Sequence, residues 1–127
     1  MIRRSLNERF AGKVLSKIKT TTIRDKAWPV GVPIMLFRWS GKPYRSKQIE
    51  IAPVIVEETG SIHITHREDG GMIYAGFIHQ NFDLIKGTRL HESEGFESRA
   101  EMDDWFRPLV KPGQTVTKAL MRFSLHP

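Results

Sequence analysis

Six consecutive residues near the N-terminus combine side chains that can hold an anion or attack a carbonyl carbon. Residues 19–24 have the sequence Lys-Thr-Thr-Thr-Ile-Arg, and this β-branched run favours a strand. Alternate strand side chains share a face, so Thr20, Thr22 and Arg24 are expected to lie together. Two hydroxyls and a guanidinium on one face can bind a phosphate or a carboxylate. An exposed, threonine-rich strand with solvated charges would have the same composition.

Lys19 adds a possible base to this group. A threonine hydroxyl is a poor nucleophile and needs a base within about 3 Å. A lysine can serve only if its pKa lies well below the usual value of about 10.4. Burial and the positive charge of Arg24 would lower the pKa of Lys19, whereas a carboxylate in direct contact would raise it. Lys19 reaches the face of Thr22 only if the chain bends before Thr20.

The residues before this segment predict a helix that leads into it. Apolar side chains recur every three or four residues, the spacing of an amphipathic helix, at Leu6, Phe10, Val14, Leu15 and Ile18. Ser5 and Glu8 form a candidate capping box at its start. The helix should end near Lys17, before the β-branched run, and this change of structure permits the bend that Lys19 needs.

The rest of the chain predicts further strands. Strand patterns cover 32–39, 48–57, 61–66, 72–78 and the residues that follow Pro112 and Gly113. Pro53 implies an edge or a bulge, and the sequence Glu-Asp-Gly-Gly at 68–71 is typical of a hairpin turn. The last strand is expected to present Thr117, Ala119, Met121, Phe123 and Leu125 on one face.

A second helix is predicted over 98–109. Ser98 and Glu101 form a capping box at its start, and its apolar face consists of Met102, Trp105, Phe106 and Leu109. Two helices and about six short strands within 127 residues predict one α+β domain. We expect a curled sheet or small open barrel, with the helices covering its side or end.

Two stretches resemble the ASCH family, whose members share the PUA-like β-barrel fold. The pattern Lys-Thr-x-Thr-Ile-Arg after an amphipathic helix resembles the family signature, here at 19–24. An acidic residue, a short link and a capped helix also resemble the family, here at 92–102 and onward to Trp105. The resemblance covers about two thirds of the chain. It implies a single domain over 1–127 that is a PUA-like small open β-barrel with two main helices. Residues 60–90 match nothing in the family and are expected to form an added hairpin and loop.

The resemblance also implies a function connected with RNA. Small bacterial members of the family include N4-acetylcytidine amidohydrolases, whose catalytic lysine, threonine and glutamate correspond here to Lys19, Thr22 and Glu94. Glu92 and Glu97 lie nearby and are alternatives for the acidic position. Those members usually have Gly-Arg before the lysine, where this chain has Lys-Ile. We expect amide hydrolysis through acyl-Thr22, with Glu94 orienting the substrate amine or a water rather than pairing tightly with Lys19.

The distribution of charge indicates a polyanionic partner. The formal net charge is +6, but residues 1–47 hold twelve Lys or Arg against two acids, and residues 48–127 hold eight against twelve. Such asymmetry can steer phosphates to one side of a domain. The loop 41–47 places Tyr44 among Lys42, Arg45 and Lys47, so it can stack a base while the cations hold phosphates. A hairpin kept soluble by charge would have the same composition.

Several classes of protein are excluded or disfavoured. The chain has no cysteine, which excludes disulfides, thiolate catalysis and cysteine-based zinc sites. No apolar run approaches the roughly 18 residues of a membrane helix, and the polar start does not resemble a signal peptide, so a cytoplasmic location is expected. His63 and His66 are three residues apart and should point to opposite faces of a strand, so we expect no metal site. No cofactor is expected, and no oligomeric state is indicated.

Two functions fit these patterns best. The first is an amidohydrolase acting on modified nucleosides such as N4-acetylcytidine, and the second is a non-catalytic RNA-binding module with Lys19 as a phosphate contact. A ribonuclease that uses the same lysine and a tyrosine is a third possibility. An RNA-binding module should lose affinity steeply with salt, whereas an enzyme acting on neutral nucleosides should not.

Overall fold

One strand of 19 residues, β4 (Gln48–His66), organises the structure. The computed structural model describes residues 1–78 and 83–127 of the chain. The first part of β4 pairs with β3 (Pro33–Trp39) and the last part with β5 (Met72–Ile78), while residues 54–65 pair with β7 (Thr115–Leu125). All three partners are antiparallel to β4.

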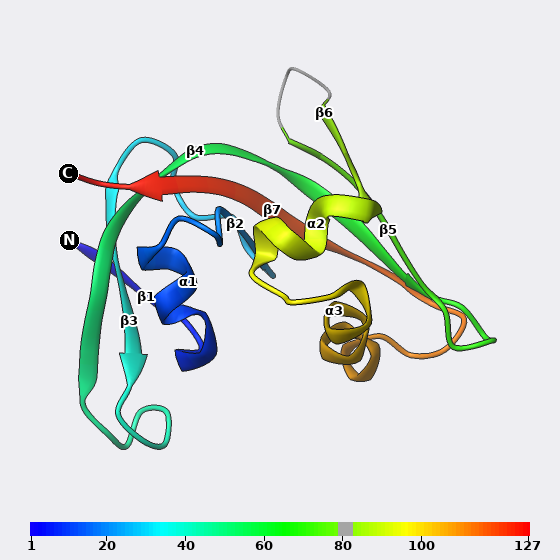
Figure 1. Cartoon of the computed structure of the whole chain (residues 1–127), viewed down its shortest axis with the longest axis horizontal. Helices are drawn as coiled ribbons and strands as arrows, with labels where there is room; N and C mark the ends of the chain where they lie inside the picture. Colours follow the sequence, from blue (N-terminus) through cyan, green and yellow to red (C-terminus); the bar gives the residue numbers. More distant parts are fainter. Residues whose placement is uncertain (79–82) are drawn as a thin grey trace.

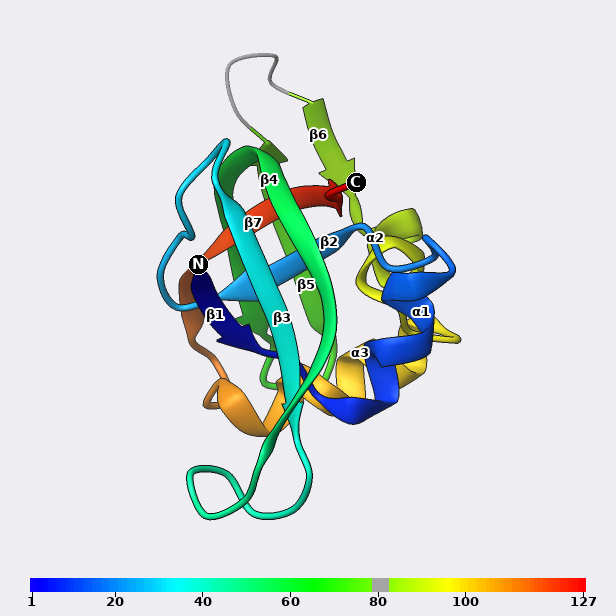
Figure 2. The same cartoon turned by 90° about the vertical axis from the view of Figure 1, so that its left-hand side faces the viewer.

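Three further strands complete a mixed sheet of seven strands. β1 (Ile2–Ser5) is parallel to β3. β6 (Asp83–Lys86) is antiparallel to β5, and β2 (Thr21–Arg24) is antiparallel to β7. The sheet curls strongly, as Figures 1 and 2 show. The α+β prediction is therefore confirmed. Among the described residues the sheet does not close on itself, and the PUA-like barrel stays a prediction.

Three short helices lie inside the curve of the sheet (Figure 1). They are α1 (Ala11–Leu15), α2 (Gly87–Glu94) and α3 (Arg99–Phe106). A 3₁₀ turn (Glu8–Phe10) precedes α1, and another (Arg107–Leu109) follows α3. In the described ranges, none of the helices has the length and apolar character needed to cross a membrane.

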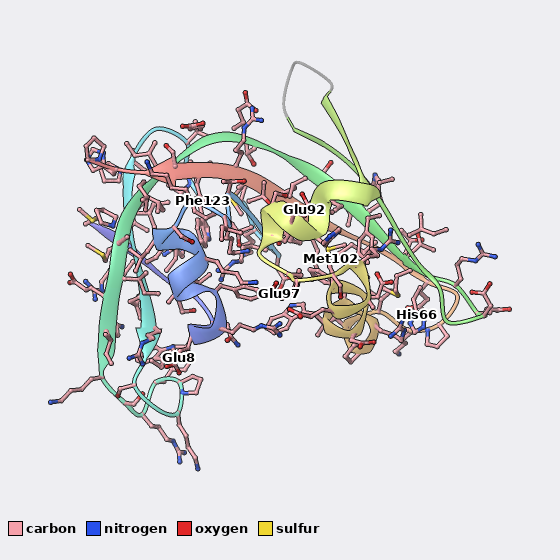
Figure 3. All side chains as sticks on the ribbon, in the orientation of Figure 1. Glu8, His66, Glu92, Glu97, Met102 and Phe123 are labelled. Carbon is pink, nitrogen blue, oxygen red and sulfur yellow. The ribbon has the colours of Figure 1, made fainter. Side chains whose placement is uncertain are left out.

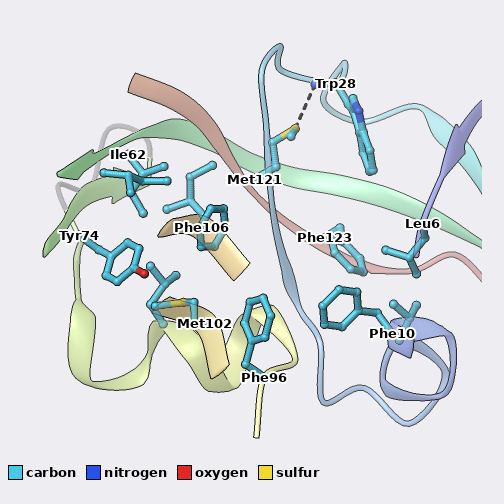
Figure 4. Close-up of a cluster of buried hydrophobic side chains, with 14 of the residues drawn as sticks. Leu6, Phe10, Trp28, Ile62, Tyr74, Phe96, Met102, Phe106, Met121 and Phe123 are labelled. Carbon is cyan, nitrogen blue, oxygen red and sulfur yellow. Dashed lines mark hydrogen bonds between the residues drawn. The ribbon is translucent and has the colours of Figure 1, made fainter. Parts of the chain in front are cut away.

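Buried apolar side chains from the helices and the sheet form the core between them (Figure 4). Phe10, Phe96 and Phe106 come from the helical side, and Ile62 and Phe123 from the sheet. Leu120 and Met121 are neighbours on β7 and both fully buried. Because neighbouring strand residues point to opposite faces, β7 is covered on both sides at this point. The face predicted to run from Thr117 to Leu125 is one of these two, and its first residue, Thr117, is exposed.

The N-terminal helix is much shorter than predicted. Residues 2–5 pair with β3, and the Leu6 amide donates to Phe37 O, so Ser5 ends a strand rather than capping a helix. Asn7 is the cap instead, and its side chain accepts from the Arg9 amide. These long-range backbone bonds outweigh the local helical pattern. Leu6, Phe10 and Val14 are buried as expected, but Leu15 and Ile18 lie at or beyond the end of the helix and are more than half exposed.

All of the predicted strands are present, and two of them are merged into one. The stretches 48–57 and 61–66 are both parts of β4. Leu36 pairs with Ala52 but Phe37 pairs with Glu50, so a bulge lies beside Pro53, as expected. The hairpin turn at 68–71 is confirmed, with Gly70 at a φ of 91°. The sequence patterns did not predict β1, β6 or α2. Part of the expected loop, 79–82, lies outside the described residues, so the addition over 60–90 stays a prediction.

The second predicted helix is confirmed at its start. Ser98 Oγ accepts from the Glu101 amide at 3.1 Å, as a capping residue does. Met102 and Phe106 are buried and Trp105 is partly buried. The α-helix ends at Phe106, and the following 3₁₀ turn contains Pro108. This change of geometry turns Leu109 outward, so its predicted place on the apolar face is wrong.

Candidate functional site

A cavity of about 250 Å³ lies beside β2, between the segment that precedes α1 and the residues from Glu94 to Phe106. We call it the Lys19 cavity. Its polar wall consists of Ser5, Asn7, Lys19, Thr22, Arg24 and Glu94, and its apolar wall of Leu6, Phe10, Ile23, Phe96, Trp105 and Phe106. The cavity therefore brings together Lys19 and Glu94, which are 75 positions apart in the chain.

β2 places two of the predicted residues on one side of this cavity. Thr22 pairs with Met121 and Arg24 with Ala119 in β7. Arg24 Nε donates a hydrogen bond of 3.0 Å to Thr22 Oγ1, so these two side chains share a face as predicted. Thr20 precedes the strand and lines a separate hollow with Lys17 and Phe123. The prediction that Thr20 joins them is wrong, because the regular alternation begins only at β2.

Lys19 is buried, with 4% of its surface exposed. Its Nζ donates to the main-chain oxygen of Glu94 at 2.7 Å and lies 4.8 Å from the centre of the Phe10 ring. Burial is the main cause that lowers the pKa of Lys19, and the charge of Arg24 acts in the same direction. The Glu94 carboxylate opposes both but does not cancel them. The direction matches the one predicted from sequence.

Glu94 is the acidic residue that enters the cavity. It is 3% exposed, and its Oε2 accepts a hydrogen bond from Thr21 Oγ1 at 2.5 Å. Its Oε1 lies 3.7 Å from Lys19 Nζ, so the pairing with Lys19 is loose, as expected. Of the two alternatives, Glu92 is exposed and Glu97 is exposed and bonded to Lys13 (Figure 3).

Thr21 is a site residue that the sequence patterns missed. It is buried, and its hydroxyl contacts both Glu94 and Ser93 Oγ, the latter at 3.0 Å. Alternation along the strand separates Thr21 from Thr22, which is why it was not grouped with the predicted residues. The only indication of Thr21 in the sequence was that residues 20–22 are three consecutive threonines. Its role here is to hold the carboxylate of Glu94.

Gly95 explains how the end of α2 can deliver Glu94 to the cavity. The amides of Gly95 and Phe96 donate to the carbonyl oxygens of Glu92 and His91, the pattern of a Schellman motif. Gly95 has a φ of 93°, which favours glycine. A Cβ there would lie 3.1 Å from the Phe10 ring and 3.3 Å from Lys19 Cβ. Close approach of the backbone to the cavity therefore requires glycine.

Aromatic rings form much of the apolar wall. The ring centres of Phe10 and Phe96 are 5.3 Å apart, and those of Phe10 and Trp105 are 5.6 Å apart. The guanidinium of Arg9 lies within 5.5 Å of the centres of all three rings. Phe10 meets both of the other rings edge to face. Spacing placed Phe10 and Trp105 on apolar helix faces, and an apolar spacing pattern does not separate a core ring from one that lines a cavity.

The predicted binding loop 41–47 lies outside the Lys19 cavity. Tyr44 is 89% exposed and lines a neighbouring hollow, while Arg45 and Lys47 line neither. His63 bonds the Thr117 hydroxyl on an exposed face, and His66 is buried against Val110 O, so the two do point to opposite faces. Among the described residues, no group of three or more acidic or histidine side chains is arranged to hold a metal ion.

No protein-family model, curated protein or solved structure matches the chain.

Proposed function

We propose that the chain is an ASCH-type domain that binds a modified nucleoside derived from RNA and hydrolyses an amide bond on its base. N4-acetylcytidine is the most concrete substrate. The observation that supports this proposal is the convergence of Lys19, Thr22, Arg24 and Glu94 in one cavity with aromatic walls. An amine of lowered pKa, a hydroxyl, a guanidinium and a carboxylate are the groups that acyl transfer needs.

The proposed reaction begins at Thr22. Its hydroxyl oxygen attacks the acetyl carbonyl carbon while the neutral amine of Lys19 takes the hydroxyl proton. Arg24, which already donates to Thr22 Oγ1, stabilises the oxyanion. The bond from carbon to N4 then breaks, and the Lys19 ammonium returns the proton to N4, so that cytidine leaves. Water oriented by Glu94 hydrolyses acetyl-Thr22, which releases acetate and restores the hydroxyl.

One contact must change before the proposed reaction can start. Lys19 Nζ donates to Glu94 O, and it makes no hydrogen bond to Thr22 Oγ1 in the described structure. Catalytic hydrogen bonds commonly tighten only when substrate is bound. A substrate amide can take the place of Glu94 O as the partner of Nζ, and the lowered pKa of Lys19 favours release of its proton.

Incubation with N4-acetylcytidine and related acylated nucleosides, followed by chromatography, tests the proposal. We expect cytidine and acetate as products. Replacement Thr22→Ala should lower kcat/KM by about 10³-fold or more, because it removes the nucleophile. The matched control is Thr117→Ala, an exposed threonine outside the cavity, which should retain wild-type turnover. Deacetylation that survives Thr22→Ala unchanged would refute acyl transfer through this residue.

A non-catalytic RNA-binding module is the second candidate. It is favoured by the contact of Lys19 Nζ with Glu94 O and the Phe10 ring, which suits a charged ammonium. In that case Lys19 contacts phosphate, and the nucleoside panel gives no product although RNA binds.

A further inference from the structure

A second hollow adjoins the Lys19 cavity. It has a volume of about 440 Å³, and its walls include Arg38, Trp39 and Tyr44. Ser5, Leu6 and Asn7 line both this hollow and the Lys19 cavity, so the two abut at this segment. We call the second hollow the Tyr44 groove. A ligand longer than one nucleoside that leaves the cavity across this segment would meet the groove.

The groove presents an aromatic surface to solvent. Tyr44 is 89% exposed, and its ring centre lies 5.2 Å from that of Trp39. Its φ of 63° lies in the left-handed region, which is unfavourable for a residue with a side chain. An exposed ring held by unfavourable backbone geometry calls for a reason beyond folding.

The loop that carries Tyr44 is held in shape by its own hydrogen bonds. Ser46 Oγ donates to Lys42 O at 2.8 Å and accepts from the Gly41 amide at 3.0 Å. The Ser40 amide donates to Lys47 O at 2.8 Å. The ring of Tyr44 is therefore presented before any ligand arrives, which reduces the entropy lost on binding.

The cations of this loop have no acidic partners among the described side chains. Some of the other N-terminal cations are paired, such as Arg3 with Glu50 and Lys13 with Glu97. Among the described residues, no ion pair involves Lys42, Arg45 or Lys47, and all three cations are exposed. The loop therefore offers positive charge to phosphates beside an open aromatic ring.

We propose that the Tyr44 groove binds the nucleotide next to the one held in the Lys19 cavity, so that the substrate is a modified cytidine within single-stranded RNA. This inference rests on the proposed function of the cavity. A base can stack on Tyr44 only if it is unpaired and free to turn out. The cations of the loop then contact the backbone phosphates, as in single-strand binding grooves.

Binding of a fluorescently labelled RNA pentamer with a central, unmodified cytidine tests the inference without turnover. We expect Tyr44→Ala to weaken binding about tenfold, because stacking on one ring is lost. Tyr44→Phe keeps the ring and should bind within about twofold of wild type. The matched charge control is Lys111→Gln, an exposed lysine that lines neither hollow, and it should bind as wild type does. The pentamer annealed to its complement should bind more weakly, and a DNA pentamer shows whether the ribose contributes.

The outcomes separate this inference from the proposed function. Equal affinity of wild type and Tyr44→Ala for the pentamer overturns the inference, even if the chain deacetylates N4-acetylcytidine. Equal affinity for the duplex also overturns it. Binding that depends on Tyr44, together with no acetate from an acetylated pentamer, supports the groove and refutes the amidohydrolase. Since Tyr44 is exposed, its replacement should leave thermal unfolding unchanged, which checks that the variants are folded.

Discussion

Lys19 shows how opposing effects of similar size set the chemistry of one residue. Removing an ammonium from water costs several kcal/mol. At the 3.7 Å that separates Nζ from Glu94 Oε1, attraction between unit charges is worth about 4 kcal/mol at an effective dielectric constant of about 20. The pKa of Lys19 is lowered, so burial together with the repulsion from Arg24 exceeds the attraction. Loose pairing with Glu94 is what leaves room for a neutral amine.

The lowered pKa of Lys19 makes stability depend on pH. The unfolded chain keeps the ordinary pKa of 10.5 for this lysine and binds its proton where the folded chain has lost it. The free energy of unfolding of the wild type, relative to Lys19→Met, should therefore rise with pH between the lowered pKa and about 10.5, by at most about 1.4 kcal/mol per pH unit. Urea unfolding of both proteins from pH 7 to 10 measures the difference. A difference that does not change with pH over this range would mean that Lys19 stays charged in the folded chain.

At the scale of elements, the site depends on where α2 stops. Gly95 ends α2 and places Glu94 in the cavity, and Lys13 Nζ donates to Gly95 O at 2.6 Å, which ties this turn to α1. The segments that carry Lys19 and Glu94 are thus connected through main-chain groups as well as through their side chains. A change at this turn should disturb both stability and activity.

Two glycines of the chain provide a matched comparison. Gly95→Ala should lower the free energy of unfolding by at least about 2 kcal/mol, because a left-handed residue with a side chain costs about 1–2 kcal/mol and the new methyl group crowds Phe10 and Lys19. Gly12 lies within α1, and no atom lies within 4 Å of a Cβ added there. Gly12→Ala should therefore raise the free energy of unfolding by about 0.5–1 kcal/mol. Urea unfolding compares the two. Equal effects would contradict the role given to Gly95.

At the scale of the whole molecule, the charge asymmetry of the sequence is partly cancelled by folding. Arg3 pairs with Glu50, Arg9 with Glu101 and Lys13 with Glu97, so basic residues of the first part meet acids of the second. Each exposed pair contributes little to stability. Their effect is to remove positive charge from the surface, so the sum over residues 1–47 overstates the field that a phosphate meets.

The dependence of RNA affinity on salt concentration should therefore reflect the contribution of a few cations. If Lys42, Arg45 and Lys47 contact three phosphates, raising salt from about 50 to about 200 mM should weaken binding of the RNA pentamer about 20-fold. Turnover of the neutral nucleoside should change by less than about twofold over this range. The triple replacement of these cations by Gln should flatten the dependence, with Lys111→Gln as the control. An unchanged slope in the triple variant would place the phosphate contacts elsewhere.

Local patterns in the sequence were enough for much of this architecture. The strand at β2, the hairpin around Gly70, the bulge beside Pro53 and the Ser98 cap depend on residues close together in the chain, so propensity and spacing determine them. The same is true of Thr22 and Arg24, which share a face because strands alternate. For the lowered pKa of Lys19, the sequence supplied only the contribution of Arg24, because burial, the main cause, depends on the folded chain.

Contacts between distant residues decided the rest. β1 displaced the start of the predicted helix because its amides pair with β3, and Thr20 lies outside the cavity because strand alternation starts after it. Only the folded chain brings Glu94 to Thr21, over a separation of 73 positions, and turns core-type rings into cavity walls. Spacing along a sequence describes a single element, whereas a cavity depends on the positions of several elements relative to one another, which tertiary packing sets.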